Sequence, residues 1–318
     1  AEEIETPGPG QVQALITVAS NPVLSTPNGP RIAAALDRLD FMVSLDIYLN
    51  ETTRHADVIL PGASPLEQSH YDVAFPQFSW RNHARYSAPV LPRAAGQPQE
   101  WETLLRLAAI AEGRGAAADV QAIDDARLEA DAKRAAGDGA AGLLRELAGR
   151  SGPERWLDLA LRTGPYGLTL AALEAAPGGI DLGPLAPRLP ELLRTPSGRI
   201  ELAPPLLVAD LQRVRDDLAQ APAPLVVVGR RDVRSGNSWM HNLPVLAKGP
   251  ERCTALVHPD DAARLGLRDG AVARIRGAHG EVQARVELSD AMMPGVVSLP
   301  HGWGHDLPGT RLAVAAER

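Results

Sequence analysis

The first 61 residues alternate short apolar runs with turn-forming and helical segments, and this alternation is what most constrains the fold. The runs are QALITVAS (13–20), FMVSLDIY (41–48) and DVILP (57–61), and RIAAALDRLD (31–40) has apolar residues at helical spacing. Such alternation predicts a parallel sheet covered by helices. Because ligands of open parallel sheets bind beyond the carboxyl ends of the strands, the residues that follow each run are candidates for a ligand site.

Two polar residues stand at the predicted strand ends. Asp46 ends the second strand, and its carboxylate can accept the paired N–H donors of a guanine edge. From spacing alone, a helix cap or a loop salt bridge is the preferred explanation of the same residue. Asn21 ends the first strand and has the same two interpretations, because Asn-Pro is also a turn signal.

The segment between the second and third runs, NETTRHA (50–56), is polar and charged. It predicts a helical turn that Asn50 caps, with Glu51 facing the positive end of the turn. Glu51, Arg54, His55 and Asp57 are expected to hold the turn that presents Asp46.

The middle of the chain changes in texture. Residues 73–99 are rich in aromatic residues and proline, which predicts irregular structure, whereas residues 100–176 are rich in Ala and Leu and predict several helices. The carboxylates of DDARLEADAKR (124–134) predict a solvated helix face. Residues 177–205 are again rich in proline and predict an extended connector.

From residue 224 the chain becomes β-rich. LVVVGR (225–230), CTALVHP (253–259) and GVVSLP (295–300) predict strands, and residues 270–288 predict two more strands around an Ala-His-Gly turn. DDAARLGL (260–267) predicts a short helix with Pro259 and Asp260 at its start. Several short strands with one helix favour a small β-barrel.

The segment VGRRDVRSGNSWMHN (228–242) follows one of these strands. It offers glycines for close backbone approach, arginines for phosphate or other anionic groups, and short polar side chains for hydrogen bonds. We expect an anionic ligand here, with a solvated basic loop as the alternative. The hydrogen-bonding residues are Ser235, Asn237, Ser238 and Asn242.

The segment HGWGH (301–305) has two histidines four residues apart, a spacing that is compatible with metal binding. The intervening glycines argue against the rigid helix of a helical zinc site, so a loop that lines a site is the preferred interpretation. His258, His279 and Cys253 are expected to be a residue that begins a helix, a turn residue and a small buried apolar residue.

Composition excludes several classes of function. The net charge of -7 argues against a nucleic-acid partner, which would need a basic face. There is no 18-residue apolar run that could span a membrane, and the single cysteine excludes an internal disulfide or a cysteine-built iron–sulfur site within this chain. These features predict a cytoplasmic protein. The sequence around Ala1 and Arg318 also suggests a piece of something longer.

Six segments in order resemble one known family. They are ITVASNPVLSTPN, LDFMVSLDIYLNETTRHADVILPGASPLEQ, TPSGRIELAP, NSWMHNLPVLAKG, HPDDAARLGLRDG and MPGVVSLPHGWGH. Together they resemble the C-terminal half of the molybdopterin oxidoreductases, the group that contains formate dehydrogenases, nitrate reductases and dimethyl sulfoxide reductase. The resemblance implies an α/β fold with a partial Rossmann-like parallel domain (1–98), a helical region with an extended connector (99–222), and a C-terminal six-stranded double-psi β-barrel, the molydopterin dinucleotide-binding domain (223–318).

The resemblance also implies a cofactor. In this family a molybdenum or tungsten ion is held by two pterin dithiolenes, each usually extended as a molybdopterin guanine dinucleotide. Matching motifs place Asn21, Leu45 and Asp46 at one guanine dinucleotide, with Gln68 and Glu100 as secondary candidates. They place the loop of His301 near the pterin and diphosphate, together with Gly229, Arg230, Arg231, Arg234, Ser235, Gly236, Asn237 and Ser238.

The departures from the family are equally informative. The N-terminal iron–sulfur cysteines, and the segment whose cysteine, selenocysteine or serine ligates the metal, have no counterpart in this sequence, and the family's C-terminal Asn and Lys would lie beyond Arg318. We therefore expect no catalytic and no metal-ligating side chains here. An iron–sulfur cluster is expected only in a missing N-terminal part.

The sequence thus predicts the cofactor-binding part of a molybdopterin-dependent oxidoreductase, with a formate dehydrogenase-like branch favoured. It would need a missing N-terminal region or a complementary catalytic chain, a small-molecule substrate and an electron-transfer partner, and would be inactive alone. Two alternatives stay open: a non-catalytic cofactor-binding or structural subunit that complements a separate catalytic chain, and a standalone nucleotide-binding module.

Overall fold

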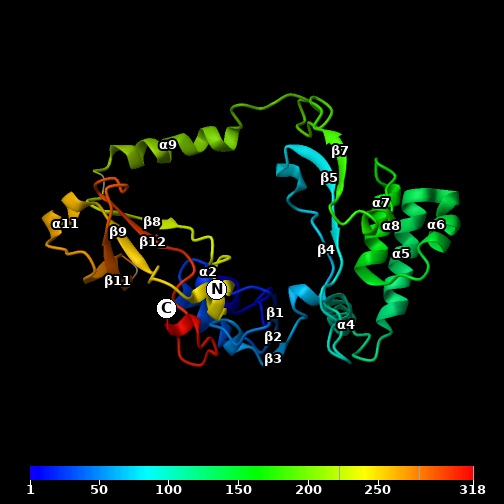
Figure 1. Cartoon of the computed structure of the whole chain (residues 1–318), viewed down its shortest axis with the longest axis horizontal. Helices are drawn as coiled ribbons and strands as arrows, with labels where there is room; N and C mark the ends of the chain where they lie inside the picture. The colour runs from blue at the N-terminus through cyan, green and yellow to red at the C-terminus, as the bar shows by residue number, and fades with distance from the viewer. Residues whose placement is uncertain (222, 279, 318) are drawn as a thin grey trace. The chain divides into compact units, whose positions relative to one another are not determined.

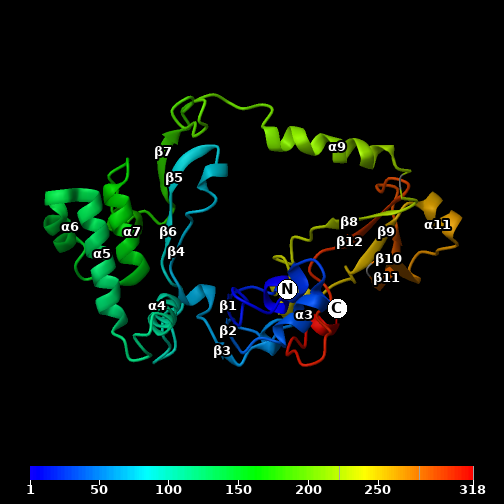
Figure 2. The same cartoon turned by 180° about the vertical axis from the view of Figure 1, so that it is seen from behind.

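The structure is a computed structural model that describes residues 1–221, 223–278 and 280–317. It contains two compact units: residues 1–61 with 202–318 form the first, and residues 62–201 form the second (Figures 1 and 2). Residues 62–98 pack within the second unit, and the predicted domain boundaries, which follow the family motifs, stay a prediction.

The α/β part of the first unit contains the predicted parallel sheet. Its strands are β1 (Ala14–Val18), β2 (Phe41–Leu45) and β3 (Val58–Leu60), in the order β1-β2-β3. The helical elements beside them are α1 (Glu2–Glu5), α2 (Pro22–Ser25), α3 (Gly29–Leu36) and the 3-10 turn η1 (Thr53–His55). The predicted order of strand, loop, helix and strand is confirmed.

The helical spacing of residues 31–40 reflects burial against this sheet. Val23, Leu36 and Met42 form the centre of a core cluster, and Ile32 and Leu39 pack against it. Thr17 of β1 and Ser44 of β2 are also buried, and their hydroxyl oxygens lie 2.7 Å apart, so each satisfies the other.

The β-rich part of the first unit is a five-stranded mixed sheet. Its strands are β8 (Val226–Arg230), β9 (Thr254–Val257), β10 (Val272–Gly277), β11 (Gly280–Leu288) and β12 (Val296–Pro300), in the order β10-β11-β9-β12-β8. In the described part of the chain, β8 and β10 are the edges and do not pair, so the sheet is an open half-barrel. The five strands form where expected, but the closed six-stranded double-psi barrel is not confirmed.

Helix α11 (Pro259–Leu265) packs on this sheet and begins as predicted. Nδ1 of His258 accepts a hydrogen bond of 3.1 Å from the backbone N–H of Asp260, so His258 caps the helix. Asp261 is buried and accepts a hydrogen bond of 2.6 Å from the backbone N–H of Gly295. Cys253 is only half-buried, which corrects the expectation of full burial, and His279 lies outside the described residues.

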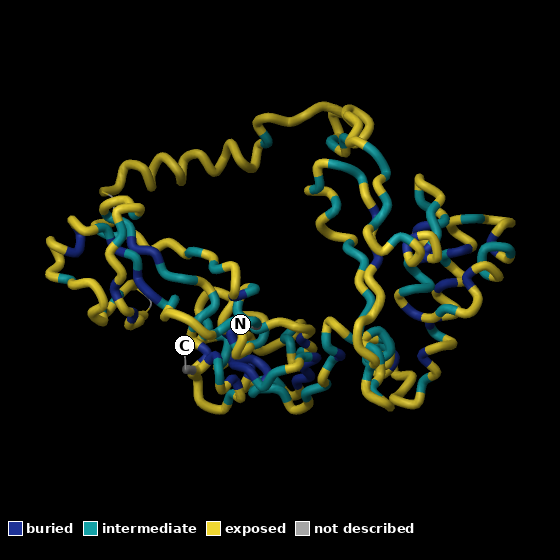
Figure 3. Tube along the Cα trace, in the orientation of Figure 1, coloured by how far each residue is buried: buried dark blue, intermediate teal, exposed yellow. Residues whose placement is uncertain are grey.

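The remaining helical elements of the first unit are α9 (Pro205–Ala219), η5 (Trp239–Asn242), α10 (Pro244–Ala247) and η6 (Ala315–Glu317). Helix α9 was not expected from the sequence and is exposed along its whole length (Figure 3). Within the described ranges, none of the helices has both the length and the apolar character needed to cross a membrane.

The second unit has the predicted helices, which are α4 (Glu100–Ala111), α5 (Val120–Ala136), α6 (Ala140–Glu146), α7 (Gly152–Thr163) and α8 (Leu170–Glu174), with the 3-10 turns η2 (Pro65–Glu67), η3 (Pro76–Phe78) and η4 (Gly137–Gly139).

Two short antiparallel sheets correct the expectation of irregular structure. In one, β4 (His70–Tyr71) pairs with β6 (Tyr86–Ser87); in the other, β5 (Arg81–Ala84) pairs with β7 (Ile180–Pro184). The predicted connector therefore begins as a strand.

One carboxylate of α5 also corrects the prediction of a solvated face. Asp124 is buried and accepts hydrogen bonds from Nε1 of Trp156 at 2.7 Å and from Nη2 of Arg155 at 2.5 Å. Its partners lie on α7, so Asp124 joins two helices of the second unit.

Candidate functional site

Asn21, at the end of β1, is held by the loop that follows β2. Its side-chain N–H donates to Oε2 of Glu51 at 2.8 Å, and its Oδ1 accepts from the hydroxyl of Thr52 at 2.7 Å. The same hydroxyl oxygen accepts a hydrogen bond from the backbone N–H of Val23 at 3.1 Å. The side chain of Asn21 therefore ties the ends of two neighbouring strands together.

Asp46 begins a chain of hydrogen bonds into the same loop. Its carboxylate accepts from the backbone N–H of Tyr48 and from the side chain of Asn50, both at 3.1 Å. Oδ1 of Asn50 in turn accepts from the backbone N–H groups of Thr52 and Thr53, both at 2.9 Å, which confirms the predicted cap. In the described residues Asp46 thus makes loop hydrogen bonds rather than the helix cap or salt bridge considered from the sequence, and its carboxylate has further lone pairs for a ligand.

The preceding residue, Leu45, is buried, and its carbonyl accepts from the backbone N–H of Ala19 at 2.9 Å. Its contribution to this region is the position of its backbone at the strand end.

The other charged residues of the turn have separate partners. Nδ1 of His55 lies 2.6 Å from Oδ1 of Asp37, and Oδ2 of Asp57 accepts from the backbone N–H of Met42 at 2.7 Å, so both hold the turn as expected. Nε of Arg54 donates to Nε2 of His55 at 3.2 Å, which also holds the turn as expected, and its Nη1 donates to the carbonyl of Pro308 at 2.6 Å. It therefore joins the turn to the far end of the sequence.

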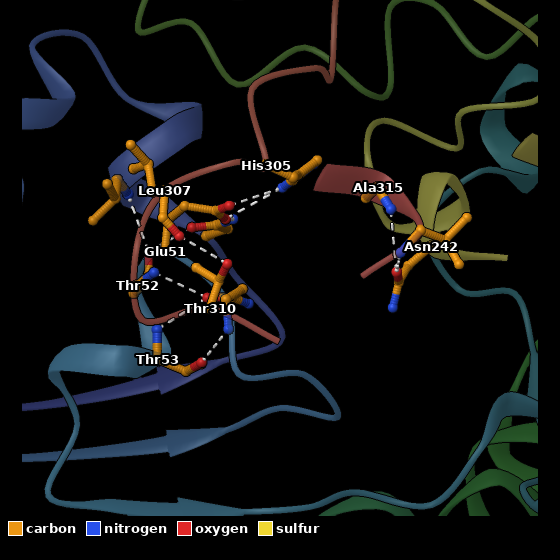
Figure 4. A network of polar contacts seen from close by, with 12 residues as sticks. Glu51, Thr52, Thr53, Asn242, His305, Leu307, Thr310 and Ala315 are labelled. Carbon is orange, nitrogen blue, oxygen red and sulfur yellow. Dashed lines mark hydrogen bonds and ion pairs between the residues drawn. The ribbon is translucent and has the colours of Figure 1, made fainter. Parts of the chain in front are cut away.

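Glu51 is the centre of this network and is fully buried. Nδ1 of His305 lies 3.1 Å from Oε1 and 3.3 Å from Oε2 of Glu51, and Asn21 donates to Oε2 (Figure 4). Burial by itself raises the pKa of Glu51, but the hydrogen bonds from His305 and Asn21 outweigh it and leave the pKa below its usual value. The sequence placed Glu51 only in its own turn and gave no signal of this partner.

The C-terminal segment, residues 301–316, connects both sheets of the first unit. The backbone N–H of His301 donates to the carbonyl of Arg230 at 2.9 Å, and that of Arg311 donates to the carbonyl of Leu49 at 2.8 Å. Oδ1 of Asn242 accepts from Val314 and Ala315 at 3.1 and 3.3 Å (Figure 4). The side chain of His301 itself is exposed.

The arginine that ends β8 and the two arginines that follow it differ in environment. Arg230 donates to the carbonyl of Ser298 at 2.8 Å and to the hydroxyl of Thr254 at 2.8 Å, so its guanidinium fastens β8 to its neighbours. Arg231 donates to Oδ1 of Asn237. Arg234 is exposed, which leaves its guanidinium accessible to a ligand.

The arginine loop, residues 230–242, is tightly packed. The hydroxyl of Ser235, a buried residue, donates to the carbonyl of Asp232 at 2.6 Å. Gly236 has a φ of +50°, and a Cβ there would lie 2.9 Å from the side chain of Met240. Ser238 makes no side-chain cap to the turn η5 that it precedes, and Gly229 lies within β8 with open space beside it.

A small pocket lies between the arginine loop and the C-terminal segment. It has a volume of about 20 Å³, which is room for about one water molecule. Its lining brings together both charges and two aromatic rings, and consists of Asp232, Arg234, His241, Leu246, Ala247, Pro250, Glu251, Arg252 and Trp303.

Two buried imidazoles stand beside this pocket. The ring centroid of His241 lies 4.1 Å from that of Trp303 and 6.2 Å from that of His305, which meets it edge-on. Nε2 of His241 and Nε2 of His305 are both buried, and neither has a hydrogen-bond partner among the residues that the structure describes. Burial lowers the pKa of His241, and the neighbouring His305 lowers it further.

The secondary candidates Gln68 and Glu100 belong to the second unit. Gln68 donates to the carbonyl of Ala63 at 3.0 Å. Glu100 begins α4, and its Oε1 lies so close to Gly62 that a Cβ there would be 2.3 Å away. Among the residues that the structure describes, no three His, Cys, Asp or Glu side chains are grouped as a metal site would require.

Comparison with known protein families addresses both parts of the first unit. The family model of the molybdopterin oxidoreductases matches residues 1–89, and that of the molydopterin dinucleotide binding domain matches residues 225–316. The chain belongs to the molybdopterin oxidoreductase family. The two matches cover the parallel sheet and the half-barrel.

Two individual relatives show how much of a longer protein the chain corresponds to. The assimilatory nitrate reductase catalytic subunit of Bacillus subtilis is 42% identical over 66 residues, which are 21% of this chain and 9% of the relative. A probable oxidoreductase of the same organism, YoaE, is 24% identical over 308 residues, which are 95% of this chain and 40% of the relative. The chain thus spans less than half the length of these relatives.

A solved structure shares the fold. The acetylene hydratase from Pelobacter acetylenicus superimposes with a TM-score of 0.64 at 20% sequence identity, over 98% of this chain and 40% of the hydratase. At this identity the similarity concerns the fold alone.

Polar groups of the first unit have the chemistry to contact an anionic dinucleotide. The exposed guanidinium of Arg234 can bind phosphate, and among the described residues the buried Nε2 atoms of His241 and His305 have no hydrogen-bond partner.

Proposed function

We propose that this chain is the dinucleotide-binding part of a molybdopterin-dependent oxidoreductase. One observation carries the proposal: the C-terminal segment fastens the loop of Asp46 and Glu51 and the arginine loop into one unit, and two buried imidazole nitrogens there have no partner in the described part of the chain. The matched dinucleotide-binding domain supports a molybdopterin guanine dinucleotide as the ligand.

Particular residues would hold the two ends of this cofactor. Arg231 and Arg234 would bind the diphosphate, since guanidinium groups pair with phosphate oxygens in a bidentate way. Asp46 would accept the N1–H and N2–H groups of guanine, because its two present hydrogen bonds leave lone pairs free. Asn21 and Leu45 would shape the strand ends beside it. The bound cofactor would supply two-electron redox chemistry at molybdenum or tungsten.

The intact enzyme would include a further polypeptide segment. Parallel sheets are normally covered on both faces, yet Ile16 and Val18 of the edge strand β1 are 49% and 47% exposed. A preceding region or a complementary catalytic chain would cover these exposed side chains of β1. That region or chain would also hold an iron–sulfur cluster and the metal-ligating residue. Such an enzyme would be cytoplasmic, would be formate dehydrogenase-like, and would pass electrons from a small-molecule substrate to a separate partner.

A binding experiment with the 318-residue chain tests the dinucleotide proposal. GDP represents the guanosine end of the cofactor, and ADP is the control for base selectivity. Isothermal titration calorimetry should show tighter binding of GDP, and Asp46→Asn should remove most of that preference. Arg234→Ala should weaken both nucleotides and reduce the salt dependence, whereas Arg268→Ala, at an exposed arginine of the half-barrel, should change neither.

Equal affinity for GDP and ADP in the parent chain would refute the guanine assignment, and no binding of either nucleotide would refute the proposed function. The enzymatic proposal requires a second assay, in which the chain is combined with a metal-ligating N-terminal region and loaded with cofactor. Oxidation of formate would support the formate dehydrogenase-like branch, whereas reduction of nitrate would point to a nitrate reductase-like branch in its place. The absence of any redox turnover would favour the non-catalytic subunit.

A further inference from the structure

We propose that Glu51 is a positioning residue that fixes the ring of His305 and thereby presents Nε2 of that ring to the bound dinucleotide. This inference rests on the proposed function, because it names a protein group that would act on the same ligand. It concerns a residue of the parallel-sheet part that acts through a residue of the C-terminal segment.

The hydrogen bond between His305 and Glu51 has a defined direction. Glu51 is fully buried, its carboxylate is already an acceptor for Asn21, and Nδ1 of His305 lies 3.1 Å from Oε1. An ionised carboxylate only accepts hydrogen bonds, so Nδ1 must carry the proton. In the neutral ring the lone pair is then on Nε2, which is the reverse of the tautomer that prevails in free histidine, whereas in the protonated ring Nε2 carries a second N–H.

The environment of Nε2 of His305 decides what it can contact. It is buried and lacks a partner within residues 1–221, 223–278 and 280–317, although buried polar atoms nearly always have one. The charged groups around the two rings are Glu51 beside His305, and Asp232, Arg234, Glu251 and Arg252, which line the pocket with His241. Nε2 of His305 is therefore available to a ligand, as an acceptor in the neutral ring and as a donor in the protonated ring.

The C-terminal segment packs closely against the arginine loop. The backbone at Gly302 packs so closely against the arginine loop that a Cβ there would lie 2.0 Å from the carbonyl oxygen of Asn237. His305 lies three residues further along the same segment and is held by Glu51. The position of His305 therefore sets how residues 301–305 lie against the loop that carries Arg234.

A purely structural role for Glu51 predicts loss of stability on substitution and nothing else. A positioning role also predicts a particular tautomer of His305 and a response of Nε2 to the ligand. Nuclear magnetic resonance distinguishes the two, because long-range ¹H–¹⁵N correlation spectra report the protonation of each imidazole nitrogen. His305→Asn identifies the resonances.

The tautomer experiment needs no ligand. In the parent chain the Nδ1 of His305 should stay protonated between pH 6 and 8. In Glu51→Leu the proton should move to Nε2, and Glu51→Gln, which retains an acceptor oxygen, should restore part of the parent pattern. An Nε2–H tautomer in the parent chain would overturn the proposal.

The ligand experiment follows GDP binding by the same spectra, with each variant first shown to be folded by circular dichroism. The Nε2 resonance of His305 should shift on GDP addition, and Glu51→Leu should weaken GDP about tenfold, as expected for one lost hydrogen bond. Glu3→Leu, at an exposed glutamate, is the matched control. An unchanged GDP affinity in Glu51→Leu would overturn the positioning role. If the parent chain does not bind GDP, the proposed function fails, while the tautomer experiment still decides the relation between Glu51 and His305.

Discussion

Glu51 and His305 are 254 residues apart in the sequence, yet Nδ1 of His305 lies 3.1 Å from Oε1 of Glu51 in the interior of the first unit. The pair joins the loop after β2 to the segment that follows β12. Removal of either partner would leave the other buried without its counterpart, which is a more costly change than the loss of an exposed ion pair.

Substitution of Glu51 should therefore destabilise the first unit strongly. We expect Glu51→Ala to lower the free energy of unfolding by about 3–5 kcal/mol, because it leaves His305 and Asn21 without their shared acceptor. Urea denaturation followed by circular dichroism measures this change. Glu3→Ala should have an effect below about 0.5 kcal/mol, and a similar loss in both variants would contradict the interpretation.

Acid should weaken the first unit in two ranges of pH. The pKa of His241 is lowered from 6.5 by burial and by His305, so the unfolded chain binds a proton before the folded chain does as the pH falls below 6.5. The pKa of Glu51 is held below 4.5. Below pH 4.5 this carboxylate therefore also binds a proton in the unfolded chain before it does so in the folded chain. In both ranges stability that is present at higher pH is lost on acidification.

Urea midpoints measured from pH 8 to pH 4 test this dependence. His241→Gln should flatten the upper range, and Glu51→Gln should reduce the slope of the lower range. A midpoint that rises between pH 6.5 and 5 in the parent chain would contradict the direction derived for His241.

Two glycines of the C-terminal segment form a matched pair. Gly302 and Gly304 have similar φ angles of +100° and +102°, so alanine is strained at both, but only at Gly302 would a Cβ meet another residue, the carbonyl of Asn237 at 2.0 Å. Gly302→Ala should therefore destabilise the first unit more than Gly304→Ala and should displace the arginine loop. Denaturation and GDP affinity of the two variants measure the difference, and equal effects would show that the close contact is unimportant.

Asn242 should anchor the end of the C-terminal segment. Its Oδ1 accepts hydrogen bonds from the backbone N–H groups of Val314 and Ala315, and Asn242→Ala leaves both without that acceptor. We expect hydrogen exchange at residues 312–316 to become faster and the free energy of unfolding to fall by about 1–2 kcal/mol. Gln220→Ala, at an exposed position after α9, is the control, and unchanged exchange at residues 312–316 would argue against the anchor.

Much of the fold could be predicted from the sequence because its signals are local. The spacing of Ile32 and Leu36 reflects one buried helix face, and the cap by Asn50 depends on residues only two and three positions away. Short runs of β-branched residues likewise marked β1, β2 and the five strands of the half-barrel.

Other features could not be predicted because they depend on distant partners. Asp124 reads as one more carboxylate on a solvated helix, and only the packing of α7 against α5 buries it with Trp156. The proline-rich residues 177–205 gave no sign that β7 would pair with β5, since that pairing joins residues about a hundred positions apart.

The candidate site divides in the same way. The sequence by itself determined which residue types stand at the strand ends and in the arginine loop, and its motifs determined the family. Only the tertiary structure decided that Arg230 is hydrogen-bonded within the half-barrel while Arg234 is exposed. It also decided that the buried partner of Glu51 is His305. The reason is physical: a side chain's burial and hydrogen-bond partners are set by whichever segments pack against it, and in this chain those segments lie far away in the sequence.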